Sequence, residues 1–137
     1  MAYVNATINE GGYASFQSDT ATAATIGLYI RCKFSTTADT SQDGKPTLIA
    51  AGVTERGNVI AMQSIAAGSF GTCRFLNAQG EQFGIASGTI GVGSAVYTAA
   101  NGKYSTTSTG GALLAGTATT AGYDGGAFTF LPVVAAA

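Results

Sequence analysis

The residues best suited to chemistry are the oxygen-bearing side chains of the segment DTSQDG. Asp39, Ser41 and Asp43 place oxygen ligands at alternate positions, and Gly44 takes the sixth, as in the first half of a calcium-binding loop. The twelfth position is Ala50, where such a loop requires a bidentate glutamate. We therefore interpret the segment as a polar turn and predict no metal or other cofactor. Asp39, Ser41 and Asp43 remain the alternative calcium ligands.

Other catalytic constellations are scarce. The sequence has no histidine, which removes the commonest general base and the usual partner of a serine or cysteine nucleophile. The glycines of GTIGVGSA, which begins at residue 88, lack the lysine that completes a phosphate-binding loop. Glu55 and Arg56 are adjacent, as is typical of a solvated loop tip, and the other acidic residues are dispersed. We predict that the protein is not an enzyme.

Charge argues against a nucleic-acid or membrane partner. Only 9% of the 137 residues are charged, the formal net charge is −1, and the six basic residues are scattered. Binding to nucleic acid or to an anionic membrane requires clustered Lys and Arg. No apolar run reaches the length of a membrane span, and the N-terminus lacks the pattern of a signal peptide. We expect synthesis in the cytoplasm, with no nucleic-acid or membrane partner.

Composition favours strands joined by many turns. The chain contains 20 glycines with abundant Ala and Thr, a mixture that forms helices poorly. Residues 26–35 alternate apolar and polar side chains, which predicts a half-buried strand with Arg31 on the polar face. Further strand-like runs occupy residues 47–54, 57–68 and 69–77, with a short helix as the alternative for 57–68. We predict a mostly β fold, either a small antiparallel β-barrel or a sandwich, with many glycine-rich turns.

One hairpin has a specific turn signal. Asn101 and Gly102 stand between two strand-like runs, and this dipeptide is typical of a two-residue type I′ turn, which needs positive φ at both central positions. A two-residue loop would pair Ala100 with Lys103, Ala99 with Tyr104, and Tyr97 with Thr106.

The chain divides into a polar N-terminal segment and a β domain. The polar composition of residues 1–25 predicts an extended arm, and we expect residues 26–137 to form a single domain. A weak internal similarity suggests two related β-units, 26–77 and 88–134, although similar composition explains it nearly as well. The arm carries apolar residues with no evident core of their own, which are candidate contacts with a partner: Tyr3, Val4, Ile8, Tyr13 and Phe16. Alternatively, the arm is an edge strand of the same domain.

Two cysteines, Cys32 and Cys73, are too few for a disulfide framework in a chain of this length. We interpret both as small buried hydrophobic residues in a reducing compartment. A bridge between them stays an open alternative.

Residues 88–133 resemble the head decoration (cement) proteins of tailed bacteriophages and related small Ala/Gly/Thr-rich proteins of phage structural modules. The similarity rests on a strand after a glycine, a hairpin ending in Gly-Lys, a Gly-apolar-Gly strand, a glycine turn and a terminal strand. The residues that carry it are Gly93, Val96-Tyr97, Asn101-Gly102-Lys103, 111–116, Gly125-Gly126 and 128–133.

This resemblance implies a protein that binds the outside of the expanded phage head and stabilises it. Its partners would be the major capsid protein and further copies of itself, with a trimer favoured, and the arm would order on the capsid. The location would be the exterior of the virion. Alternatives are another virion component, such as a tail-tube, spike or head-completion protein, and a carbohydrate-binding or adhesion module.

Overall fold

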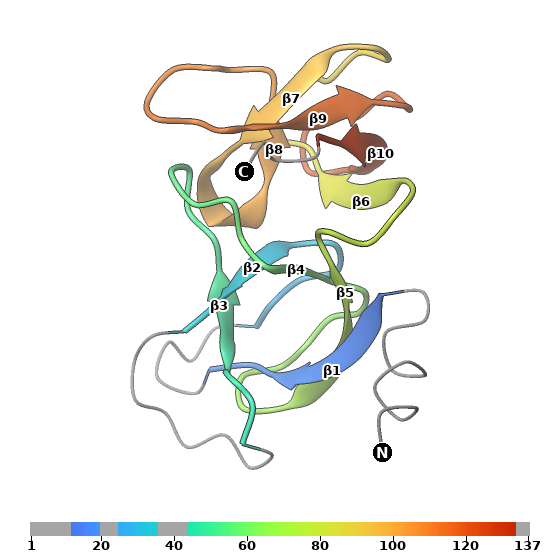
Figure 1. The fold of residues 1–137 in the computed structure, drawn as a ribbon. Coiled ribbons are helices and arrows are strands. Elements are labelled where there is room, and N and C mark those ends of the chain that lie inside the picture. The colour runs from blue at the N-terminus through green and yellow to red at the C-terminus, as the bar shows by residue number, and fades with distance from the viewer. Residues whose placement is uncertain (1–11, 20–24, 36–43, 134–137) are drawn as a thin grey trace.

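The computed structural model describes residues 12–19, 25–35 and 44–133, and the regular secondary structure of this part of the chain consists almost entirely of strands (Figure 1). Ten strands form two antiparallel five-stranded sheets, which confirms the predicted mostly β fold. The sheets are not closed into barrels, so the arrangement is sandwich-like. The elements are β1 Tyr13–Gln17, β2 Arg31–Phe34, β3 Leu48–Ala50, β4 Val59–Ala61, β5 Phe70–Phe75, β6 Gln82–Ile85, β7 Ala95–Thr98, the 3₁₀ turn η1 Ala100–Gly102, β8 Tyr104–Ser105, β9 Leu114–Ala118 and β10 Ala127–Pro132.

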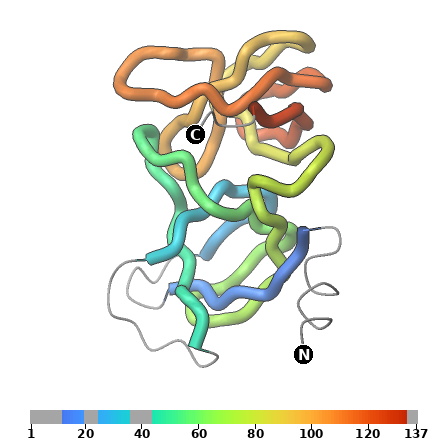
Figure 2. Tube along the Cα trace, in the orientation of Figure 1, coloured from blue at the N-terminus to red at the C-terminus, as the bar shows by residue number. Residues whose placement is uncertain are grey.

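The two sheets have the same connectivity. The first has the strand order β1-β5-β4-β2-β3 and the second β6-β10-β9-β7-β8, so each runs first-fifth-fourth-second-third. We call residues 13–75 unit 1 and residues 82–132 unit 2. Figure 2 shows one unit above the other along the trace. The units begin at β1 and β6, earlier in the chain than residues 26 and 88, where the sequence suggested related units.

Turns and bridges repeat between the units as well. The N–H of Tyr29 donates to Ala61 O at 2.7 Å in unit 1, and that of Gly93 donates to Ala118 O at 2.8 Å in unit 2. Just before each of these turns, a bridge ties the chain to the segment ahead of the last strand, Ile26 with Ile65 and Ile90 with Gly122. Non-local hydrogen bonds therefore repeat along with the strand order.

Each unit has its own apolar core. Phe16, Leu48 and Val59 are among the buried residues of unit 1, and Val96 and Phe128 are among those of unit 2. Ile60 of β4 belongs to the core cluster of unit 2, and Tyr29, Met62 and Leu76 pack against that cluster. The outer face of β4 is thus covered by unit 2, and the two units are joined by an apolar junction.

The N-terminal boundary of the β structure differs from the expected one at residue 25. Residues 13–17 form β1, an edge strand paired with β5 from Tyr13 opposite Arg74 to Gln17 opposite Phe70. This part of the expected arm therefore belongs to the sheet of unit 1, in agreement with the edge-strand alternative.

The strand expected over residues 26–35 is shorter. β2 begins only at Arg31, because the chain makes a turn closed by a hydrogen bond from Ile30 N–H to Gly27 O at 3.3 Å. Tyr29 adopts a φ of 64° within this turn, and Leu28 at its tip is 44% exposed. The side chain of Arg31, expected on the solvent face, is fully buried because unit 2 covers that face of the sheet.

The turn at Asn101 and Gly102 has the expected backbone, whereas the strand register differs. Both residues have positive φ, 58° and 71°, and Lys103 N–H donates to Ala100 O across the turn. Ala99 N–H then donates to Lys103 O, and Thr98 pairs with Tyr104. The register is one residue out from the predicted one, and it places the Tyr104 ring in the core against Phe128 and Phe130.

Candidate functional site

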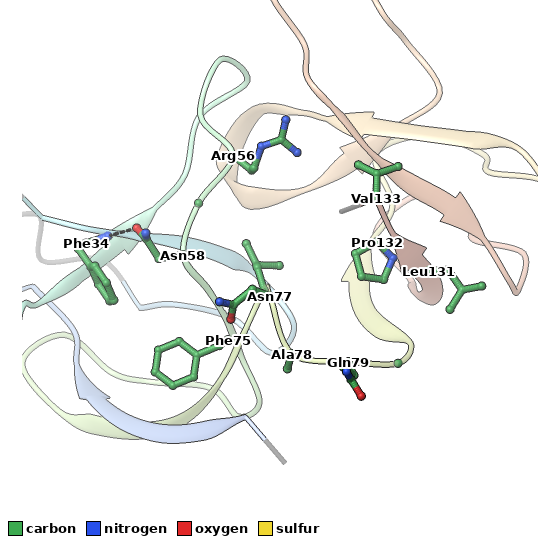
Figure 3. A pocket seen from close by; sticks show the side chains of 13 residues that line it. Phe34, Arg56, Asn58, Phe75, Asn77, Ala78, Gln79, Leu131, Pro132 and Val133 are labelled. Atoms are coloured by element: carbon green, nitrogen blue, oxygen red, sulfur yellow. Dashed lines mark hydrogen bonds between the residues drawn. The ribbon is translucent and has the colours of Figure 1, made fainter. Parts of the chain in front are cut away.

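A groove of about 640 Å³ lies between the two units. The last strand of each unit ends there: β5 and the residues after it contribute Phe75, Leu76 and Ala78, and β10 contributes Leu131 and Pro132. Figure 3 shows Phe75 on the side of unit 1 and Leu131 and Pro132 on the opposite side, with Ala78 between them. The repeated topology explains this placement, because it brings equivalent strand ends to the same junction.

The lining of the groove is mainly apolar. Leu131 is 50% exposed and Val133 is 37% exposed, while Phe34 and Phe75 are partly buried. Among the lining residues, Arg56 is the one with a charged side chain, and its guanidinium donates to Leu114 O at 3.1 Å. Such a surface is suited to binding apolar side chains of an extended segment or of another protein.

Strand addition at this side of β10 is restricted. β6 pairs with β10 only from Ala127 to Phe130, so Leu131 and Pro132 continue beyond β6. Pro132 has no N–H and cannot donate to an added strand. The groove therefore offers side-chain contacts rather than a free edge for β pairing.

Arg31 links the two units at their junction. Its side chain is fully buried and donates to Glu55 O at 2.7 Å in unit 1 and to Ala99 O at 2.9 Å in unit 2. The guanidinium also lies over the Tyr104 ring, 5.2 Å from its centroid. Burial lowers the pKa of Arg31 from its ordinary value, and the nearby Tyr104 side chain acts in the opposite direction. Arg31 holds the units in a fixed relation and has no access to a ligand in the groove.

The burial of Arg31 could not be predicted from the sequence, because alternation distinguishes two faces of a strand but does not show what covers each one. The groove was also missed, since its walls come from residues 34, 56–58, 75–80 and 131–133. No local pattern joins these segments.

The predicted apolar contacts fall into different environments. Tyr3, Val4 and Ile8 lie outside the described residues. Tyr13 is 42% exposed on β1, whereas Phe16 is 5% exposed. The Phe16 ring packs against Phe34 and Phe75, with centroids 5.3 and 5.9 Å apart, so Phe16 anchors β1 to unit 1. The possible calcium ligands Asp39, Ser41 and Asp43 also lie outside the described residues.

Both cysteines are buried in the core of unit 1 as free thiols. Burial raises the pKa of Cys32 to about 12 and that of Cys73 to about 11. The thiols are therefore protonated near neutral pH, and they act as small core side chains rather than as nucleophiles.

Two further features concern metals and membranes. Within residues 12–19, 25–35 and 44–133, no three His, Cys, Asp or Glu side chains gather in a way that could hold a metal ion. In the same ranges, no helix has the length and apolar character needed to cross a membrane.

Comparison with known proteins shows a similarity in the fold. No family model matches the sequence, and no curated protein matches it. Among solved structures, the chain is similar to the N base of the head fiber protein gp8.5 in bacteriophage phi29, with a TM-score of 0.68 and 16% sequence identity. The match covers 88% of this chain and 94% of the phage protein chain. At this identity the similarity shows a shared fold, and it extends over both units.

Proposed function

We propose that this protein is a non-enzymatic structural component of a bacteriophage virion that binds the outside of the head and stabilises it. The observation that carries the proposal is the fold match to a phage head fiber base, which extends over 88% of the chain and therefore includes both units and their junction. The resemblance of residues 88–133 to head decoration proteins supports it independently of the fold comparison.

The physical character of the chain suits such a role. A protein that braces a shell needs a stiff scaffold and surfaces for many weak contacts. Arg31 and the apolar junction connect the two units through buried contacts. Large apolar side chains are exposed at several sites, including Val92 at 68% and Tyr123 at 70%. Repetition of weak contacts over many copies on a lattice gives strong retention.

Its partners on this proposal are the major capsid protein and further copies of the same chain, with a trimer favoured. Tyr3, Val4, Ile8 and Tyr13 are the proposed shell contacts of the N-terminal segment. Phe16 leaves this set, because its ring is packed inside unit 1.

Co-sedimentation with phage heads that lack their exterior protein tests the proposal. We expect saturable binding that favours expanded heads, with copies per particle on the order of hundreds, as many repeated weak contacts require. Heads that already carry their exterior protein are the control. No binding to either form contradicts the proposal, and binding in a few multiples of three or six indicates a tail or spike component instead.

A deletion variant then tests the proposed contact segment. Removal of residues 2–11 leaves β1 intact, since that strand begins at Tyr13. We expect this variant to keep its β-type circular dichroism and to lose most of its binding to heads. Unchanged binding would show that the β units, and not the N-terminal segment, make the shell contact.

A further inference from the structure

The groove between the units is an apolar surface that the described residues leave uncovered. Leu131 and Val133 on one wall are 50% and 37% exposed, and Phe34 and Phe75 form part of the other wall. Exposed apolar surface concentrated in a groove marks a place where another apolar segment binds.

The N-terminal segment starts at the wall of this groove. Gly12 precedes β1, and its carbonyl oxygen accepts a hydrogen bond at 2.8 Å from the N–H of Phe75, a lining residue. A Cβ at Gly12 would overlap that of Ala78, another lining residue, and the φ of Gly12 is +75°. Only glycine lets the chain pass so close to this wall. The described chain therefore begins, at Gly12, beside the groove.

The length and chemistry of residues 1–11 fit the groove. Eleven residues span at most about 36 Å when extended, which exceeds the width of a pocket of this volume. The segment contains the apolar residues Tyr3, Val4 and Ile8, and Glu10 is its one charged side chain. The one charged side chain lining the groove, Arg56, has the opposite sign.

We propose that residues 1–11 fold back into the groove of their own chain, where Val4 and Ile8 pack against its apolar walls. Docking occurs through side chains, because Pro132 provides no N–H for strand pairing. The inference places the apolar residues of the N-terminal segment on the protein itself when it is free, which goes beyond the proposed function.

Disulfide trapping in the full-length chain tests the proposal. Leu131→Cys is combined with Val4→Cys in one variant and with Ile8→Cys in another, and dilute protein is oxidised under mild conditions. The native thiols of Cys32 and Cys73 are buried and do not compete. Matched controls replace Leu131→Cys by Val92→Cys, an exposed apolar site outside the groove. Peptide mass mapping identifies the crosslinks.

We expect an intramolecular crosslink to Leu131→Cys from at least one N-terminal position, with a yield about tenfold above its control because docking raises the effective concentration of the two thiols. Crosslinks between chains would overturn the proposal by showing that the groove takes the segment of a second copy. Yields equal to the controls would overturn it by showing that the segment does not dock. The experiment uses no phage head, so its result is separate from that of the proposed function.

Discussion

Units 1 and 2 share a fold but have different cores. Unit 1 buries one ring, that of Phe16, beside Cys32 and Cys73, whereas unit 2 buries the rings of Tyr104, Phe128 and Phe130. Strand order and bridging hydrogen bonds are nonetheless the same in both. The same strand order therefore accommodates different core residues.

Equivalent turns differ at one position. Gly93 has a φ of 82° in unit 2, and Tyr29 has a φ of 64° at the corresponding place in unit 1. A left-handed backbone costs a non-glycine residue about 1–2 kcal/mol. The Tyr29 ring stacks on Phe83 of unit 2 at a centroid distance of 4.5 Å, and a pair of this kind contributes about 0.5–1.5 kcal/mol. The stacking of Tyr29 on Phe83 at the junction therefore offsets much of the backbone strain at Tyr29.

The second strands also differ where they begin. β2 starts with the buried Arg31, and β7 starts with the exposed Ala95. The difference follows from position, because β2 faces unit 2 and the start of β7 faces solvent. Residues that depart from the shared pattern thus serve the contact between the units, and variants at the junction test this role.

The largest effect is expected for Arg31→Met, which keeps an apolar stem but removes the donors to Glu55 O and Ala99 O. Each buried acceptor left unsatisfied costs about 1–3 kcal/mol, so we expect the free energy of unfolding to fall by about 3–5 kcal/mol. Urea denaturation measures the change. The control is Lys33→Met on the same strand, where the ion pair of Lys33 with Glu55 is partly exposed and contributes little. Equal shifts in the two variants would contradict the linking role of Arg31.

A smaller effect is expected for Gly102→Ala. A Cβ at Gly102 would lie 2.5 Å from Arg31 O, and its φ is +71°. We expect a loss of about 2–4 kcal/mol, since backbone strain adds to overpacking at the junction. Gly125→Ala is the matched control, because its φ is +78° and no atom lies within 4 Å of the added Cβ. Thermal unfolding should show a clearly smaller loss for the control, and similar losses would mean that the junction relaxes freely.

The smallest effect concerns the core thiols at alkaline pH. Burial raises the pKa of Cys32 to about 12, from an ordinary value of 9.0. Between these values the unfolded chain releases a proton that the folded chain keeps, so stability falls as pH rises. From pH 7.5 to 10 the expected loss due to Cys32 is on the order of 1 kcal/mol.

Urea denaturation of Cys32→Ala at both pH values checks this expectation. The loss of stability between pH 7.5 and 10 should be smaller than in the wild type. Tyr104→Phe is the comparison in unit 2. Burial also raises the pKa of the Tyr104 phenol, whose ordinary value is 10.0. Because this value is higher than that of a thiol, the loss of stability due to Tyr104 begins at a higher pH than the loss due to Cys32. An unchanged alkaline loss in Cys32→Ala would show that its thiol is not protected by the fold.

Much of the strand content could be predicted from local pattern. The predicted runs contain β3, β4 and β5, and the positive φ values at Asn101 and Gly102 follow from a turn that few other residues can make. β1 could not be recognised in this way, because it lies in a polar, glycine-containing region. Its partner, β5, is more than fifty residues away in the sequence.

The candidate groove is even less predictable from local sequence pattern than β1. Phe75 and Leu131 belong to the last strands of different units, and neither has a neighbouring residue that signals a binding surface. The repeat became evident through strand order rather than through sequence similarity.

A mostly β chain with few charges and closely spaced turns follows from the amino-acid sequence, because turn dihedrals and strand propensity are local properties. The burial of Arg31, the shift of the hairpin register by one residue and the groove between the units follow only from the tertiary fold. Each of these depends on which segments pack together across long sequence separations, and the free energy of that packing is shared among residues that no local pattern connects.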